Sequence, residues 1–391
     1  MPQSKPHHPG CTRPSRREFL TSSVAGLAAG AVAPAVHAGA GDAPIRLGLV
    51  GCGGRGTGAM IQAAAADPAV RIVALGDMFP DQLDSCAHIL ARDAATQFAY
   101  PSTARFIGVD AYRRVLDADI DAVVIAAPPH LRPLHVEAAV AAGVHVFCEA
   151  PAAVEVAGVS RLAEALAAAR AAGLVVASGL HSRRDAVLAA LVADVQAGGI
   201  GRPVSVDVHA TWRGPWRVAA QPAWTAAEER LRNWASHRAL SGGHFVERHV
   251  HAIDRALWVL GDRAPAVAEP LSGAGDDDVA VRYGFEDGAQ LCASSIRVAS
   301  GPDAMREAVV GSRGVRDLEL PADGRRFQAT MDAFVRAVRR ESPIDDGDIL
   351  VRASLVTLMG RLAATRGRAI GWDEMLAATP LPAQFAMSAK V

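Results

Sequence analysis

The residues best suited to proton transfer lie in one short segment. His244, Glu247, His251 and Asp254 follow one another at spacings of three, four and three residues, so on a helix all four side chains share one face. Oxidation of a secondary alcohol needs a base for the hydroxyl proton, and a histidine titrates in the right range. We therefore predict that His251 accepts a proton with help from Glu247. His249 turns away from this face, and we expect it and Asp254 to have structural roles.

The same helix face offers an alternative chemistry. His244, Glu247 and His251 are suitable ligands for a divalent metal ion. Their spacing differs from that of the HExxH zinc motif. The prediction is therefore a site without a metal, with these three residues kept as the alternative metal site.

A glycine-rich turn near the N-terminus predicts a dinucleotide site. A predicted strand at residues 45–50 leads directly into residues 51–56, which have the spacing GxGxxG. The first glycine permits a tight turn, the second lets the backbone approach a pyrophosphate, and the third packs helix on strand. Asp77 lies 21 residues past Gly56, where a carboxylate would hydrogen-bond the adenosine ribose and favour NAD over NADP. The predicted cofactor contacts here are Gly51, Gly53, Gly54, Arg55, Gly56 and Asp77.

Two further predicted strands bring more side chains to this site. The strand at 122–127 ends at Pro128 and His130, and the strand at 144–148 ends at Glu149. Ligands bind at the carboxyl ends of the strands in an open α/β sheet, so these three residues are also predicted cofactor contacts. The alternation of strands with alanine-rich helices predicts an α/β fold, with a doubly wound parallel sheet over residues 44–180.

The remaining chain predicts a second α/β domain at residues 181–378 and a tail at 379–391. The β-branched alternation and the helical stretches place strands at 204–210, 279–285 and 290–297 and helices at 331–340 and 350–365. A broad sheet follows from these strands.

Three residues near the domain junction are candidates for substrate contact. Indole faces suit the apolar faces of sugars, so Trp212 and Trp216 are candidates; the alternative is a loop pinned by buried indoles. Arg183 follows the last strand of the first domain and could bind substrate or form a salt bridge.

Composition excludes several classes of protein. The 391 residues are half hydrophobic, which is enough for two domains with full cores. Lys plus Arg number 40 against 41 Asp plus Glu, so no global field would attract nucleic acid. Five irregularly spaced cysteines without a CxxC pair indicate neither a disulfide framework nor a thiolate zinc site.

The first forty residues have the pattern of an export signal. Ser15-Arg16-Arg17-Glu18-Phe19-Leu20 leads into a weakly apolar stretch at 21–38 that ends in small residues, as in twin-arginine signals. We expect residues 1–40 to be cleaved without stable membrane insertion, after the twin-arginine export machinery delivers the protein to the periplasm. This route moves folded proteins, so a cofactor would have to be loaded beforehand and held tightly.

These segments together resemble the glucose-fructose oxidoreductase and inositol dehydrogenase family (Gfo/Idh/MocA). The matching segments are residues 51–56, 121–130, 144–151, 242–254 and 360–376. The chain looks most like exported members that carry RNW, SGG and VExHVHxxD segments, here at 232–234, 241–243 and 246–254. The resemblance implies a Rossmann domain, a second α/β domain with a large, open, mostly antiparallel sheet, a homo-oligomer, and NAD(P)-dependent chemistry on sugars or polyols.

One position departs from the family. The resemblance implies Glu-Lys-Pro, with the lysine supporting the substrate hydroxyl, but this chain has Glu149-Ala150-Pro151, and its lysines are Lys5 and Lys390. Losing one preorganised donor typically costs roughly 10²- to 10³-fold in rate. Three functions therefore remain open: an exported sugar oxidoreductase with retained NAD, a redox-neutral NAD-dependent glycosidase, and a catalytically silent protein that binds NAD or a sugar.

Overall fold

The computed structural model describes residues 43–99, 103–272, 278–318, 325–377, 379–382 and 385, and these fall in one compact unit. The predicted export signal at residues 1–40, and most of the predicted tail, lie outside the described residues. Among the helices that are described, none has the length and apolar character needed to cross a membrane.

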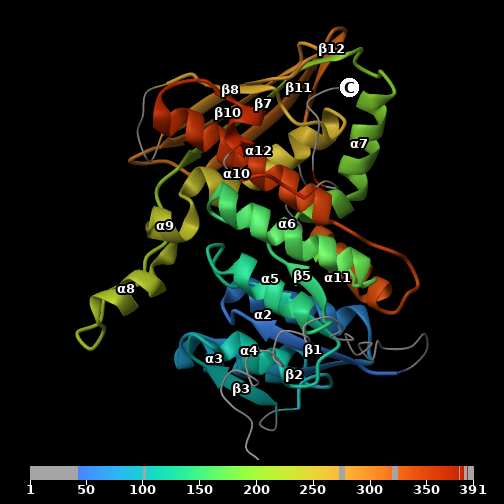
Figure 1. Ribbon diagram of the computed structural model, residues 1–391, viewed down its shortest axis with the longest axis vertical. Coiled ribbons are helices and arrows are strands. Elements are labelled where there is room, and N and C mark those ends of the chain that lie inside the picture. The colour runs from blue at the N-terminus through green and yellow to red at the C-terminus, as the bar shows by residue number, and fades with distance from the viewer. Residues whose placement is uncertain are drawn as a thin grey trace, which may run out of the picture. The chain divides into compact units, whose positions relative to one another are not determined.

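The N-terminal half contains a six-stranded parallel sheet in the order β3-β2-β1-β4-β5-β6 (Figure 1). Every residue of the neighbouring strands β4 and β5 is buried, which fits their hydrophobic sequences. This arrangement confirms the predicted doubly wound sheet. The strands are β1 (Ile45–Val50), β2 (Val70–Asp77), β3 (Ala104–Ile107), β4 (Ala122–Ile125), β5 (His145–Cys148) and β6 (Val176–Ser178). The connecting helices are α2 (Gly54–Ala66), α3 (Pro80–Asp93), α4 (Ala111–Leu116), α5 (Arg132–Ala141) and α6 (Val156–Ala171).

The second half contains a seven-stranded sheet in the order β12-β11-β7-β10-β9-β8-β13. Only β7 and β10 pair in parallel; the other described pairs are antiparallel, as the resemblance implied. The strands are β7 (Pro203–Trp212), β8 (Val267–Pro270), β9 (Val279–Gly284), β10 (Gln290–Arg297), β11 (Ala304–Gly311), β12 (Gly314–Asp317) and β13 (Ile370–Gly371).

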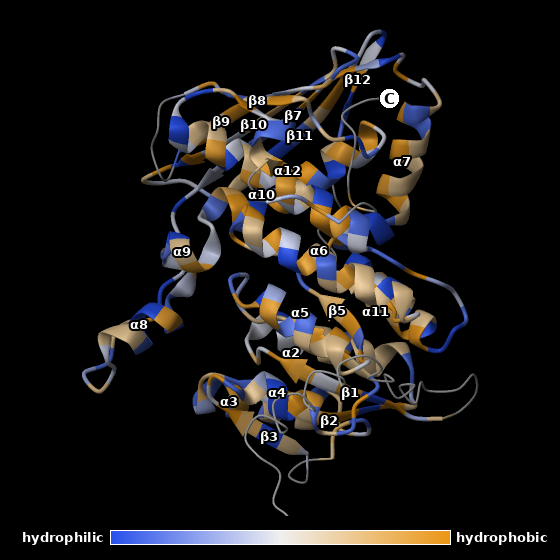
Figure 2. Ribbon diagram, viewed as in Figure 1, coloured by the Kyte–Doolittle hydropathy of each residue, from blue (hydrophilic) through white to orange (hydrophobic). Residues whose placement is uncertain are grey.

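Helices α10 (His244–Val259) and α12 (Gly347–Arg366) cover one face of this sheet. Hydrophobic residues recur along both helices and along α6, between hydrophilic ones (Figure 2). Their buried residues join those of β7, β9 and β10 in one core. Because α10 lies between the sheet and the first domain, it can present side chains to the carboxyl edge of the parallel sheet.

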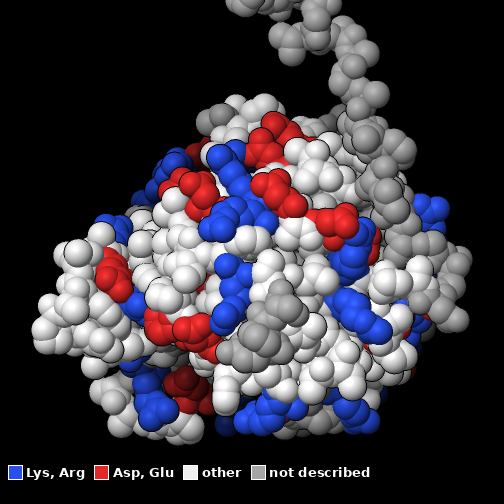
Figure 3. Space-filling view, turned by 90° about the horizontal axis from the view of Figure 1, so that it is seen from below, with Lys and Arg blue, Asp and Glu red and all other residues white. Residues whose placement is uncertain are grey.

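The C-terminal segment returns to the first domain. Helix α11 (Arg325–Val338) packs Met331, Phe334 and Val335 into the core formed by β1, β2 and α2. The shorter elements are a 3-10 helix η1 (His181–Arg184), α7 (Ala186–Gln196), α8 (Ala226–Arg232), η2 (Trp234–Ser236), α9 (Arg238–Ser241) and α13 (Trp372–Leu376). Seen from below, basic and acidic side chains are interspersed on the face of the molecule (Figure 3), which agrees with the balanced composition.

Candidate active site

The glycine turn joins β1 to α2 and leaves open backbone. Gly51 has a φ of +98°, and a methyl group at Gly56 would lie 2.0 Å from the Gly51 carbonyl oxygen. Added methyl groups at Gly53 and Gly54 would meet no atom within 4 Å. The turn therefore packs tightly on one side and is open on the other, where the N-terminus of α2 can receive a phosphate. The residues present fit a dinucleotide.

A cavity of about 530 Å³ opens beside this turn, and we call it the nucleotide pocket. The described residues that line it include nearly all the predicted cofactor contacts: Gly51, Gly53, Gly54, Arg55, Gly56, Asp77, Pro128 and His130. Asp77 accepts hydrogen bonds from the backbone nitrogens of Cys52, at 2.7 Å, and Phe79, at 2.9 Å. Burial raises the pKa of Asp77. The carboxylate is thus held at the end of β2, where a ribose would lie.

A segment of the second half covers the nucleotide pocket. We call residues 213–236 the strap; its Trp216, Trp224 and Trp234 line the pocket. Trp216 was predicted as a substrate contact, and the structure places it on the nucleotide side instead. The reason is tertiary: after Trp212 the chain leaves the sheet and returns to the first domain.

Arg232 fastens the strap to α3. Its two terminal nitrogens donate to the two carboxylate oxygens of Asp81, both at 2.9 Å. Its guanidinium carbon lies 4.0 Å from the ring centre of Phe79 and 4.5 Å from that of Trp224. These contacts join the two halves of the chain beside the pocket.

A second cavity, of about 1190 Å³, adjoins the first, and we call it the substrate cavity. Arg55, Ala126, Trp234 and Glu247 line both cavities. His251 lines the substrate cavity together with Glu149 and Ala150 at the end of β5. The α10 side chains and the carboxyl edge of the parallel sheet thus meet at the junction of the cavities.

His251 has the environment of an uncharged imidazole. Burial, together with the positive charge of Arg255 and the proximity of His181, lowers the pKa of His251 to about 3. No hydrogen bond links it to Glu247 among the described residues; Glu247 lies 3.3 Å from the Nε of Arg248 instead. The predicted partnership between His251 and Glu247 is therefore not formed as a direct hydrogen bond, although both residues line the substrate cavity.

Glu149 lines the substrate cavity, next to Arg55, which lines both cavities, and its predicted role as a cofactor contact stays a prediction. Its carboxylate lies 3.0 Å from Arg55 Nε and 3.6 Å from His181 Nε2. Burial alone would raise the pKa of Glu149, but His181 and the charges of Arg55 and Arg132 outweigh burial and lower the pKa to about 2. The sheet edge therefore holds a buried negative charge between positive ones.

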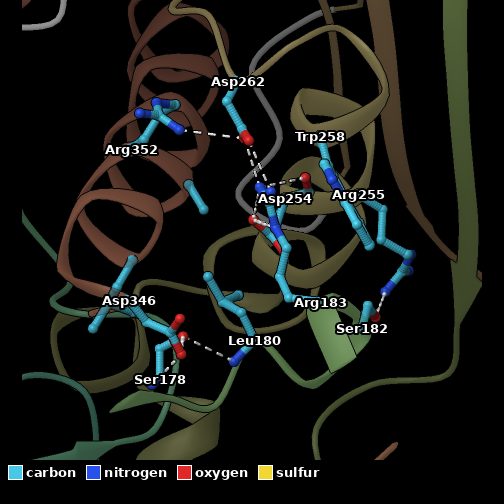
Figure 4. A network of polar contacts seen from close by, with 12 residues as sticks. Ser178, Leu180, Ser182, Arg183, Asp254, Arg255, Trp258, Asp262, Asp346 and Arg352 are labelled. Atoms are coloured by element: carbon cyan, nitrogen blue, oxygen red, sulfur yellow. Dashed lines mark hydrogen bonds and ion pairs between the residues drawn. The ribbon is translucent and has the colours of Figure 1, made fainter. Parts of the chain in front are cut away.

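Arg183 is a structural residue and not the predicted substrate contact. Its guanidinium donates to the carboxylates of Asp254, at 2.7 Å, and Asp262, at 2.6 Å (Figure 4). The side chain is 8% exposed and lines neither cavity. Asp254, the fourth residue of the predicted helix face, forms this ion pair, which agrees with the structural role predicted for it.

Trp212 is also a structural residue. Its indole stacks on the His244 ring with 3.9 Å between the ring centres, and Trp212 is 4% exposed. The alternative to a substrate contact, a buried indole with a structural role, is therefore correct for Trp212. The reason is that the inward-facing side of β7 packs against α10.

The alternative metal site is not assembled. His244 Nδ1 lies 2.8 Å from Ser295 Oγ, and the ring is stacked on Trp212. In the part of the chain that the structure describes, no group of three or more potential ligands is arranged to hold a metal ion. His249 Nε2 lies 2.9 Å from the Ser294 carbonyl oxygen, which is the structural role predicted for it.

Several residues of the substrate cavity were not predicted from the sequence, among them Arg132 and His181. Both follow predicted strands, at the edge where ligands bind, and this position was the available signal. Their residue types alone gave no reason to select them.

Comparison with known proteins agrees with this geometry. The family model described as "Oxidoreductase family, NAD-binding Rossmann fold" matches residues 45–179, and that of the "GFO/IDH/MocA C-terminal domain" matches residues 189–316. Together they span about two thirds of the chain.

Individual relatives match over different lengths. The chain is 27% identical to a myo-inositol 2-dehydrogenase of Thermotoga maritima, over 69% of this chain and 74% of that protein. It is 32% identical to a 1,5-anhydro-D-fructose reductase of Ensifer adhaerens, over 40% of this chain and only 42% of that protein.

Among solved structures, GenD2 from gentamicin A biosynthesis, in complex with NAD, has a TM-score of 0.66 and 22% identity, covering 84% of this chain and 96% of that one. This likeness is one of fold. The two family models, the parallel sheet and the open glycine turn lead to one conclusion: the chain belongs to the GFO/IDH/MocA oxidoreductase family, with an NAD-binding Rossmann domain in its N-terminal half.

Proposed function

We propose that this chain oxidises or reduces a hydroxyl-bearing carbon of a sugar, polyol or glycoside with a tightly retained NAD. The main support is the junction of the two cavities, which share Arg55, Ala126, Trp234 and Glu247. A ligand in the nucleotide pocket can therefore touch a ligand in the substrate cavity. The matched relatives, which are named as a myo-inositol dehydrogenase and an anhydrofructose reductase, support the substrate class.

His251 is the proposed proton acceptor. Burial lowers its pKa to about 3, so the ring is uncharged at neutral pH but is a weak base. Proton transfer to it depends on the negative charge of Glu149, which raises the pKa of His251 and would stabilise the imidazolium. The shared wall of the two cavities holds the alcohol close to the nucleotide and limits the entry of water. NAD, when bound, supplies the hydride acceptor. Asp77 at the end of β2 favours NAD over NADP, because a carboxylate repels a 2′-phosphate.

Retention of the nucleotide is assigned to the strap. A dinucleotide in its pocket would lie beneath Trp216, Trp224 and Trp234, and the Arg232–Asp81 ion pair would have to open before release. Retention suits the proposed export of a folded protein to the periplasm by the twin-arginine pathway, with residues 1–40 as the signal and with a homo-oligomer as the mature form. Cell fractionation with and without Arg16 and Arg17 tests the export step.

The direct test of the function is the content of the purified protein. We expect acid denaturation to release close to one equivalent of NAD(H), identified by chromatography. Protein that contains neither NAD(H) nor NADP(H), and binds neither on titration, would refute the proposal.

A catalytically silent role is the second candidate, and Ala150 favours it. This side chain lies on the substrate cavity and offers no hydrogen-bond donor there. If the wild type is inert on a broad panel of aldoses and inositols while Ala150→Lys turns over, the silent role is correct. Activity of the wild type that is lost in His251→Gln excludes it.

A further inference from the structure

Arg132 is a buried cation in the wall of the substrate cavity. It is the first residue of α5, is 6% exposed, and lines the cavity beside Ala150. Its Nε donates to the Ala127 carbonyl oxygen at 2.9 Å, and its Nη1 donates to the Pro151 carbonyl oxygen at 2.6 Å. These two carbonyls follow β4 and β5, so the guanidinium is fixed at the carboxyl edge of the sheet. Nη2 has no hydrogen-bond partner among the described residues.

The charge of Arg132 is not neutralised by a direct partner. The cavity wall has one other buried arginine, Arg255, and it is ion-paired with Glu307. Arg132, in contrast, hydrogen-bonds only neutral carbonyl oxygens within the described part of the chain. Burial accordingly lowers the pKa of Arg132. A cation held in this way is available to a ligand.

The surrounding charges leave a positive excess at this place. Arg55 and Arg132 both act on Glu149, and Glu247, which also acts on Arg132, is paired with Arg248, so three guanidinium groups face two carboxylates. In a buried site such charges act over several ångströms with little screening. Negative charge that develops on a ligand beside Ala150 would therefore be stabilised.

We propose that Arg132 is a catalytic residue, whose free Nη2 donates a hydrogen bond to the substrate oxygen and stabilises it while the hydride leaves. This inference rests on the proposed function. In the oxidation, the hydroxyl proton goes to His251, the hydride of the C–H bond goes to bound NAD, and the carbon–oxygen double bond forms. Arg132 neither gains nor loses a proton.

Substitution separates charge from size. We expect Arg132→Met to lower kcat by about 10²- to 10³-fold with little change in KM, because the interaction strengthens only in the transition state. Arg132→Lys should restore only part of this loss, because it keeps the charge but not the planar fork that bonds the two carbonyl oxygens. Arg161→Met is the matched control: this exposed arginine on α6 pairs with Glu137 and should have no effect.

A binding measurement gives a readout that needs no turnover. The oxidised nicotinamide is positively charged and the reduced one is not, so removing a nearby cation favours the oxidised form. We expect the ratio of the dissociation constants for NAD⁺ and NADH, measured by calorimetry, to shift by about tenfold toward NAD⁺ in Arg132→Met. Arg132→Gln, which keeps a hydrogen-bond donor without the charge, repeats the measurement if the methionine variant does not fold.

The results distinguish this inference from the proposed function. A wild type that binds neither nucleotide overturns both. A wild type that binds and turns over, while Arg132→Met or Arg132→Gln has the same kcat and the same affinity ratio, overturns the inference alone. In the Arg132→Met background, Ala150→Lys should restore at least tenfold in kcat, because it returns a cation to the same cavity; no recovery counts against a role for charge.

Discussion

The nucleotide pocket and the substrate cavity adjoin, but they are built in different ways. The phosphate side of the pocket is mostly backbone from one continuous segment, residues 51–56. The substrate cavity is made of side chains from both sheets and from α10 and α11. A single backbone contact should therefore be indispensable in the pocket, whereas the cavity should lose function in steps as individual side chains are removed.

The largest effect is expected at the turn itself. In Gly56→Ala, the new methyl group would lie 2.0 Å from the Gly51 carbonyl oxygen, so the turn must shift. We expect NAD affinity to fall by at least about 100-fold, with a lower melting temperature. Gly58→Ala is the control on the same helix, where the nearest heavy atom is 4.0 Å away; it should bind NAD normally and gain about 0.5–1 kcal/mol. Equal binding by both variants would contradict the backbone account.

Next comes the proton acceptor in the cavity. His251→Gln should lower kcat by about 10²- to 10⁴-fold while the content of bound NAD stays the same. Glu247→Gln should have a much smaller effect, because Glu247 contacts Arg248 and not His251. Loss of equal size in the two variants would mean that they act as a pair after all.

The pH profile sharpens the same point. Since the pKa of His251 is about 3, its base form persists at neutral and mildly acidic pH. The rate of alcohol oxidation, measured from pH 8 to pH 5, should therefore show no fall due to this histidine. An apparent pKa between 6 and 7 that disappears in His251→Gln would contradict the assignment.

The strap should govern exchange rather than chemistry. Arg232→Met removes the ion pair with Asp81 and the contacts with Phe79 and Trp224. We expect NAD to dissociate about 10- to 100-fold faster, because buried or bidentate arginine pairs contribute about 1.5–3 kcal/mol. The release of NAD after dilution is measured by fluorescence. Arg230→Met, an exposed residue of the same helix, is the control. Unchanged dissociation in Arg232→Met would show that the strap does not retain the nucleotide.

The last prediction concerns acid stability, and it also separates the two regions. His244, His249 and His251 on α10 have pKa values lowered to between about 3 and 4 by burial, and on the first domain His135 has a pKa of about 4. In the unfolded chain these histidines bind protons near pH 6.5. Their contribution to stability is therefore fully present above that pH and is lost as the pH falls toward 4.

As the pH falls through that window, each of these histidines should lower the free energy of unfolding by about 1.4 kcal/mol per pH unit. Urea unfolding at pH 7.5 and pH 5 measures the loss. Hydrogen exchange should place the greater loss in α10, where three of the four lie. A free energy of unfolding that is independent of pH would mean that the pKa values of these rings are not lowered in the folded protein.

The sequence by itself determined the first region. Strand, turn, helix and the acidic end of the next strand follow one another along the chain, and the backbone of GxGxxG has few ways to fold between them. The family, the parallel sheet and most of the residues of the glycine turn that line the nucleotide pocket could therefore be predicted.

Only the tertiary structure decided which side chains reach the substrate cavity. Arg183 pairs with Asp254, 71 residues away, and the strap brings Trp216 to the nucleotide. Arg132 gained its place because the Ala127 and Pro151 carbonyls meet at the sheet edge. The position of each long side chain depends on which charged groups and carbonyl oxygens, distant in sequence, bind it in the folded protein. The spacing of residues along the chain does not show which of these partners will bind.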